Sequence, residues 1–188
     1  MNDRMPPLSF DKMTAAQRKA ADELTAGPRK GVKGPFVPLL RAPELMDRLQ
    51  RVGEYLRFQS SLEPRIGEFV MLIISREWTQ QFEWGMHVPL GQKAGLSAEI
   101  IGAVGEGRRP PLMKPDEEVV YDFCDELLRT KGVCDFTYQR AVSAFGEHGV
   151  IDILGVAGYF ITVSMVMNVA HTPSPHDTGI SPLQPFPS

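Results

Sequence analysis

The sequence predicts one all-α domain, built as a single-domain helical bundle of seven or eight helices. Helix start signals recur along the chain, apolar residues repeat at helical spacing, and strand signals are few. The 188 residues suffice to bury a core without disulfides or metals. We therefore expect one domain over residues 1–188, with a flexible N-terminus over 1–12 and an extended proline-rich tail over 171–188.

The first third of the chain predicts two helices separated by a loop. Thr14-Ala-Ala-Gln17 has the pattern of a capping box, so a short helix begins there and ends near Gly27. Residues 27–38 contain three glycines, three prolines and three basic residues, which favours a loop whose cations are free to meet solvent or a ligand. From Pro43 an apolar stripe at helical spacing predicts an amphipathic helix that ends around Ser60.

The middle of the chain predicts a helical pair. Pro64 suits a first helical turn, and the residues after it are apolar almost all round, which is typical of a helix buried on several sides. This helix should end between residues 76 and 78, and a break near Thr79 should precede a second helix to about Ala94. Gly95 then suits a left-handed C-terminal cap, and Ser97 caps a short helix to about residue 106.

The last third predicts three helices, over residues 116–131, 135–146 and 150–170, followed by a tail that we expect to pack on a neighbouring subunit. The segment 150–170 is long enough to cross a membrane. Asp152 and Asn168 interrupt it, however, and Gly155 and Gly158 suit close helix packing. We interpret it as a buried helix and expect no membrane association.

Composition excludes several classes of protein. A formal charge of −3, with no basic cluster, gives no indication of nucleic-acid binding. Cys124 and Cys134 are ten residues apart and form neither a CxxC redox pair nor a zinc-ligand cluster, so both are expected to be reduced, structural thiols. Residues 1–10 lack the apolar core of a secretory signal, and we expect a cytoplasmic protein.

One segment concentrates chemistry-bearing residues. It runs from Pro64 to Ser97 and contains Glu68, Arg76, Gln80, Glu83, His87 and the helix ending Ala94-Gly95-Leu96. With this order and spacing it resembles the carboxymuconolactone decarboxylase and alkylhydroperoxidase-D superfamily. Redox members carry a Cys-x-x-Cys-x-x-x-His run about three helical turns after a glutamate, and here Gln80 and Glu83 stand at the two cysteine positions.

The resemblance implies an enzyme of the decarboxylase branch rather than a peroxidase. A peroxidatic thiolate and its resolving thiol are both missing, so we expect no cysteine-dependent peroxidase activity. The decarboxylase branch keeps a glutamate four residues before the histidine, which Glu83 and His87 reproduce. The implied function is a cofactor-free lyase, decarboxylase or isomerase acting on a small carboxylated lactone or oxo-acid in aromatic-compound catabolism.

Side-chain chemistry assigns roles to the three candidate catalytic residues. Residues four apart share a helix face, so the Glu83 carboxylate can fix the His87 tautomer and favour its protonated form. His87 is then a general acid/base near neutral pH, and Glu68 would orient or reprotonate it. Such a reaction needs no metal or organic cofactor, because the substrate's own carbonyl accepts the electrons that carbon dioxide leaves behind.

Candidate substrate-binding residues surround this set. An anionic substrate predicts a cationic clamp, for which Arg76 is the first choice and Arg41 the second. Trp78 and Trp84 would line an apolar, water-excluding pocket, and Gln80 would add a hydrogen bond or simply fill the old cysteine position. The family resemblance also implies a homo-oligomer, a trimer or hexamer, with the apolar 150–170 segment as interface material.

Simpler interpretations remain open at this stage. Glu83 and His87 could be a helical surface pair that only stabilises the fold. Glu68, in an apolar helix, could form a structural salt bridge with Arg65 or Arg76. The tryptophans could be core or interface residues, and the whole chain could be a non-catalytic oligomeric protein that binds small molecules.

The remaining histidines receive no catalytic role. His171 and His176 lie among prolines of the tail, where solvated histidines are common, and we expect no metal site there. His148 is expected near a helix end.

Overall fold

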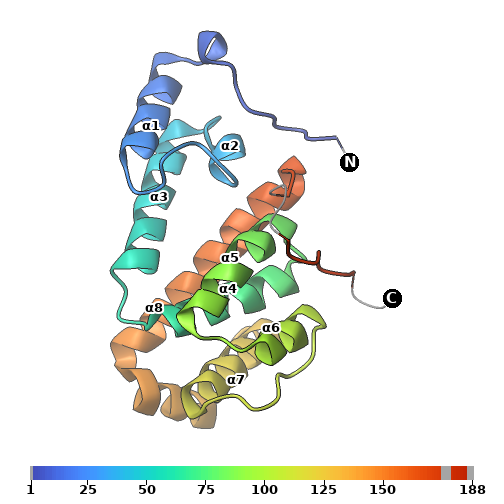
Figure 1. The fold of residues 1–188 in the computed structure, drawn as a ribbon. Helices are drawn as coiled ribbons and strands as arrows, with labels where there is room; N and C mark the ends of the chain where they lie inside the picture. Colours follow the sequence, from blue (N-terminus) through green and yellow to red (C-terminus); the bar gives the residue numbers. More distant parts are fainter. Residues whose placement is uncertain (1, 175–178, 186–188) are drawn as a thin grey trace.

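The computed structural model describes residues 2–174 and 179–185, and within them all regular structure is helical. The predicted all-α fold is therefore confirmed (Figure 1). A 3-10 helix, η1 (Phe10–Lys12), precedes α1 (Ala15–Ala26), α2 (Phe36–Leu39), α3 (Pro43–Phe58), α4 (Pro64–Glu77), α5 (Gln81–Ala94), α6 (Ala98–Gly105), α7 (Pro115–Thr130) and α8 (Asp135–Ala170).

The helix boundaries follow local chemistry that the sequence displays. Thr14 forms the predicted capping box at the start of α1, and Pro43 and Pro64 occupy the first turns of α3 and α4. Gly95 ends α5 with a φ of 101°, a conformation that favours glycine. Ser97 caps α6 by accepting a hydrogen bond from the Ile100 backbone.

One boundary prediction is wrong, and a second is confirmed in part. The loop expected over residues 27–38 contains the short helix α2, because Phe36 and Leu39 are buried against the first helices and fix the backbone there. The helices expected at 135–146 and 150–170 lie on either side of Gly146, whose φ of 68° and ψ of 169° are not helical. The predicted break is therefore present, but it is a kink at one residue rather than a short loop, and α8 (Asp135–Ala170) contains both helices.

Helix α4 lies at the centre of the main core. It packs against α5, α6, α7 and α8, which explains why its residues are apolar almost all round (Figure 1). A second, smaller core joins α1, α2 and the start of α3, where Leu24, Phe36 and Met46 are buried. The site described below lies on α4 and α5, whose antiparallel packing is therefore held from several sides.

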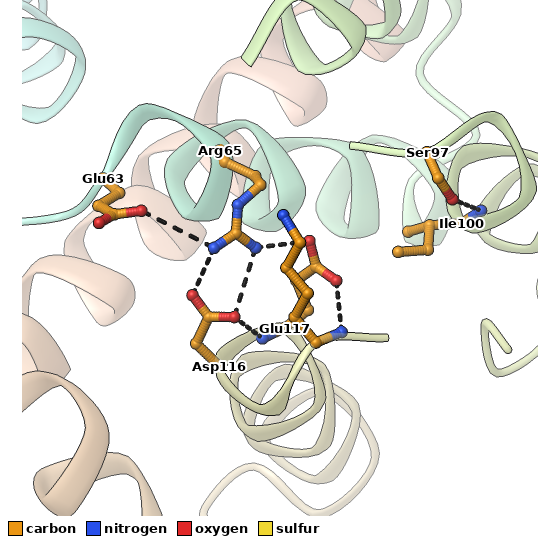
Figure 2. Close-up of polar contacts among 7 residues, drawn as sticks. Glu63, Arg65, Ser97, Ile100, Asp116 and Glu117 are labelled. Atoms are coloured by element: carbon orange, nitrogen blue, oxygen red, sulfur yellow. Dashed lines mark hydrogen bonds and ion pairs between the residues drawn. The ribbon is translucent and has the colours of Figure 1, made fainter. Parts of the chain in front are cut away.

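A buried charge network joins the starts of α4 and α7. Arg65 contacts Asp116 and Glu117 at 2.5 Å each, and Glu63 lies 3.7 Å away (Figure 2). The Glu117 side chain is only 1% exposed, so its carboxylate depends on this arginine and on the Lys114 backbone amide for compensation. Arg65 therefore pairs with carboxylates of α7.

Helix α8 is, among the described residues, the one helix long and apolar enough to cross a membrane by length and composition. Of its most apolar stretch, 56% is buried inside the protein, which favours the interpretation as a core helix. Asp152 is buried within it and accepts hydrogen bonds from the Ser61 backbone and the Tyr55 hydroxyl. His148 lies 3.5 Å from Asp152, in the first turn after the Gly146 bend and away from the terminal carbonyls of α8.

The chain ends contact the helical body. Arg4 donates its backbone N–H to the Ala170 carbonyl, and His171 contacts the Asn2 carbonyl. In the tail, Leu183 is buried and exchanges two hydrogen bonds with the Gln81 side chain of its own chain. The described part of the tail therefore packs on its own protomer, whereas His176 lies outside the described residues.

Candidate functional site

The site is built at the corner between α4 and α5. Helix α4 ends at Glu77 with Trp78 as its C-cap residue, Thr79 takes a positive φ of 45°, and Gln80 caps α5. The chain thus reverses, and Glu68 of α4 comes to face one side of α5. On that side stand Glu83 and His87, one helical turn apart.

His87 is held between two carboxylates. Its Nδ1 lies 2.7 Å from Glu68 Oε2, and its Nε2 lies 3.1 Å from Glu83 Oε2. The imidazole is 4% exposed and its edge or face meets the ring of Phe160 at 5.0 Å in a T-shaped contact. Since both ring nitrogens face acceptors, the imidazolium is the form that satisfies the whole arrangement.

In the triad of Glu68, Glu83 and His87, the two carboxylates favour the protonated form of the histidine. Burial alone lowers the pKa of His87, but the hydrogen bonds and charges of Glu68 and Glu83 outweigh it and raise the pKa from 6.5 to about 9. His87 therefore carries its proton at neutral pH. Glu83 and His87 are both buried, so the alternative that they form a solvated surface pair is wrong. Glu68 pairs with His87, whereas the simpler interpretation had it form a salt bridge with Arg65 or Arg76.

A cavity of about 460 Å³ opens beside the triad. Glu83 and His87 line it, whereas Glu68 stands behind them. Most of the wall is apolar and comes from α2, α3, α5 and α8: Phe36, Phe58, Phe82, Met86, Leu90, Phe160 and Val163. An apolar wall with few polar groups is typical of a small-molecule site.

The polar part of the wall is mainly cationic. Arg29 and Lys33 come from the loop before α2, Arg57 from the last turn of α3, and Tyr159 from α8. The sequence indicated the loop cations as available for a ligand but singled out none of them. Arg57 and Tyr159 were not considered from the sequence, because an arginine in an amphipathic helix and a tyrosine in an apolar helix give no local signal of a site.

The two arginines chosen from the sequence lie elsewhere. Arg76 is 5% exposed and donates to the Gln184 carbonyl at 2.5 Å, on the side of α4 that faces the tail and α7. Arg41 donates to the carbonyls of Val37 and Pro6. Neither lines the cavity, because the α4 and α2 turns point these side chains at backbone carbonyls of their own chain.

The other three predicted binding residues also stand outside the cavity wall. Gln80 accepts from the Phe82 backbone at 2.6 Å and donates to Asn168 at 2.8 Å, so it caps α5 and ties it to α8. Trp78 is partly buried against the main core, and its carbonyl accepts from Asn168. Trp84 is 5% exposed within that core, as the simpler interpretation of the tryptophans holds.

No family model matches the chain, and no curated protein matches it. Among solved structures, an uncharacterized peroxidase-related protein from Ralstonia eutropha JMP134, called an alkylhydroperoxidase AhpD core, matches with a TM-score of 0.75, 12% identity and 93% of each chain covered. The chain has the AhpD fold. A protein of unknown function from Agrobacterium tumefaciens, with AhpD antioxidant defence as its suggested role, matches with a TM-score of 0.66, 19% identity, and 74% of this chain and 96% of the other covered.

Within this AhpD fold, the two cysteines of the chain lie away from the triad. Cys124 is buried in α7, where burial raises the pKa of its thiol to about 12. Cys134 is exposed at the start of α8. Neither lines the cavity, and Gln80 and Glu83 stand at the corner positions that the sequence resemblance assigns to redox cysteines.

Proposed function

We propose that the protein is a cofactor-free acid–base enzyme, a decarboxylase or isomerase acting on a small carboxylated lactone or oxo-acid. The observation that carries this proposal is a buried histidine with a pKa of about 9, held by two carboxylates at the wall of an apolar cavity. Strongly perturbed titratable groups in a cavity are typical of catalytic sites.

The arrangement divides the work among the three residues. Glu68 fixes the His87 ring from behind the cavity, so it is a positioning residue. Both ring nitrogens of His87 face carboxylates, so the group best placed to exchange a proton with a substrate carbon is Glu83. In this assignment His87 stores the proton and Glu83 passes it on, which refines the direct role expected for His87.

The chemistry requires no electron acceptor beyond the substrate. In decarboxylation, the bond between the carboxylate and its carbon breaks, carbon dioxide leaves, and the electron pair moves to the conjugated carbonyl oxygen as an enolate. The proton on His87 Nε2 passes to the Glu83 carboxylate, Glu83 delivers it to the enolate carbon, and a proton from water then restores the imidazolium of His87. In isomerisation, Glu83 first removes a carbon-bound proton and later returns it at another carbon of the enolate.

Peroxide reduction by cysteine is not part of the proposal. Both described neighbours are linked by their names to AhpD, but the redox step needs two thiols, and the corner of α4 and α5 offers an amide and a carboxylate there. The carboxylate of Glu83 is instead bonded to His87.

The test is a substrate panel followed by two readouts at once. Wild type, Glu83→Gln, His87→Gln and the exposed control Glu147→Gln are incubated with carboxylated lactones and related oxo-acids in deuterated water. Carbon dioxide release and deuterium incorporation into carbon are measured. We expect turnover by wild type and control, with a fall of about a hundredfold or more in the two site variants.

Either of two results contradicts the proposal. Turnover that survives both site variants would show that the triad has no part in the reaction. Absence of carbon dioxide release and of deuterium incorporation across the panel would favour a binding protein that does not turn over its ligand.

A further inference from the structure

The cavity wall contains buried polar atoms that are only partly satisfied in the described part of the chain. Nε and Nη2 of Arg29 and the hydroxyl of Tyr159 make no hydrogen bond of good geometry, although Arg29 and Tyr159 interact with each other. Tyr159 is 7% exposed, so its hydroxyl is not compensated by open solvent. Burying a donor without a good partner costs free energy, and burying a charged one costs more, so natural proteins rarely keep three such atoms together without a use.

These atoms meet at one point on α3. A Cβ atom placed on Gly53 would lie 2.4 Å from the Tyr159 hydroxyl and 2.6 Å from Arg29 Nη2. Only a residue without a side chain leaves room for both groups there. The loop before α2 and helix α8 thus bring their polar groups together against the backbone of α3.

Both groups are held in place by aromatic rings. The Arg29 guanidinium stacks over Phe36 at 4.5 Å, which fixes its plane while leaving its edge free to donate. Tyr159 contacts Phe160 at 5.7 Å, and Phe160 in turn contacts His87 at 5.0 Å. Tyr159 and the triad are therefore placed by one set of contacting rings, and Arg29 is held beside them by Phe36.

The local charge favours an anion. Arg29, Arg57 and Lys33 line the cavity, and Glu83, bonded to His87, is the acidic residue of the same wall. Burial lowers the pKa of the Arg29 guanidinium, and the nearby Tyr159 and Glu83 oppose this, but an arginine keeps its charge at any physiological pH. Burial likewise raises the pKa of Tyr159, so its hydroxyl remains a donor.

We propose that Arg29 and Tyr159 form a carboxylate-binding site, in which one carboxylate of a small organic acid accepts hydrogen bonds from the Arg29 edge and the Tyr159 hydroxyl. Arginine presents parallel N–H groups that match the two oxygens of a carboxylate. The claim that this acid is a substrate rests on the proposed function. The claim that the site binds a carboxylate does not.

The position of the cation also selects which carboxylate it binds. Loss of carbon dioxide removes charge from the leaving carboxylate, so a cation bonded to that group would stabilise the ground state more than the transition state. The carboxylate at Arg29 is therefore one that stays on the product, and the reacting carbon lies toward Glu83.

The experiment measures binding without turnover. Benzoate and its neutral isostere benzamide are titrated by calorimetry into wild type, Arg29→Met, Tyr159→Phe and the matched control Arg48→Met, which removes an exposed arginine of α3. We expect wild type and control to bind benzoate at least tenfold more tightly than benzamide. Arg29→Met and Tyr159→Phe should each weaken benzoate binding tenfold or more, and thermal unfolding of each variant verifies its fold.

Glu83→Gln and His87→Gln separate this inference from the proposed function. Benzoate binding that persists in these two variants supports an anion site independent of the triad. Equal affinity for benzoate and benzamide in wild type, or benzoate binding unchanged in folded Arg29→Met and Tyr159→Phe, overturns the inference even where turnover is observed. Benzoate binding at Arg29 in a protein without turnover overturns only the proposed function.

Discussion

The pKa of His87 makes protein stability depend on pH in a defined window. The folded-state pKa is about 9, whereas an unfolded chain has a histidine pKa of 6.5. The folded protein therefore holds a proton that the unfolded chain has released at any pH between these values. Stability from this group is fully present below pH 6.5 and is lost as the pH rises toward 9.

The magnitude follows from the two pKa values. Each tenfold change in proton affinity corresponds to about 1.4 kcal/mol, so the rise from 6.5 to about 9 corresponds to about 3 kcal/mol. A natural domain is stable by only about 5–15 kcal/mol, so a loss of this size should be readily measured. The carboxylates of Glu68 and Glu83 are its source, since burial acts in the opposite direction.

Urea unfolding between pH 6 and pH 10 measures the free energy of unfolding, and NMR titration of the histidine rings measures the pKa of His87. His148 is exposed and provides an internal comparison in the same spectra. We expect the ring signals of His87 to remain those of an imidazolium through pH 8, and the free energy of unfolding to fall by about 3 kcal/mol by pH 10. A His87 ring that titrates at or below 6.5, or a stability that rises over this range, would refute the reasoning.

Further predictions concern the scaffold and the assembly. Glu117→Gln breaks a buried ion pair and should cost about 3 kcal/mol in urea unfolding, and a change under 1 kcal/mol would contradict this. Gly34→Ala should cost about 1–3 kcal/mol, because φ is +55° and the new Cβ would lie 2.5 Å from Phe82; unchanged stability would argue against that contact. A thiol reagent should modify Cys134 quickly and Cys124 only after unfolding; two fast thiols would contradict their placement. The solution mass should be a multiple of 20.9 kDa, such as a trimer or hexamer, and a monomer would refute the oligomer prediction.

Exposed apolar residues are the structural basis of the oligomer prediction. On α8, Ile151, Leu154, Met165 and Val169 remain exposed although the opposite face of the helix is buried in the core. On α3, Val52 and Phe58 are exposed as well. Such residues are what an interface between protomers would cover.

Local sequence chemistry predicted most of the fold. Capping residues, helix-starting prolines and Gly95 act through their own backbone and near neighbours, so their effects can be inferred without a tertiary structure. The misplaced boundary at the end of the 27–38 loop depends on distant contacts, because helix α2 forms where Phe36 and Leu39 are buried by other helices. The break at Gly146 was predictable from local chemistry, since a glycine readily takes the positive φ found there.

The candidate site was predictable only along a single helix. Glu83 and His87 are four residues apart, so helical spacing alone places them together, and the family resemblance added Glu68. The cavity wall joins a loop, α3, α5 and α8, and no spacing rule brings Arg29 or Tyr159 to His87. Arg76 is near this pair in sequence but points toward the tail, which shows why proximity in sequence is a poor guide to a clamp built from several elements.

The two positions that the sequence resemblance assigns to redox cysteines have separate roles in the structure. Gln80 is structural, because its side chain caps α5 and bonds to Asn168 of α8. Glu83 is part of the triad, because its carboxylate bonds to His87 and it lines the cavity. The carboxylates at this corner are bonded to a protonated histidine, and the donors of Arg29 and Tyr159 lie in the wall of the same cavity, where a carboxylate would complete their hydrogen bonds.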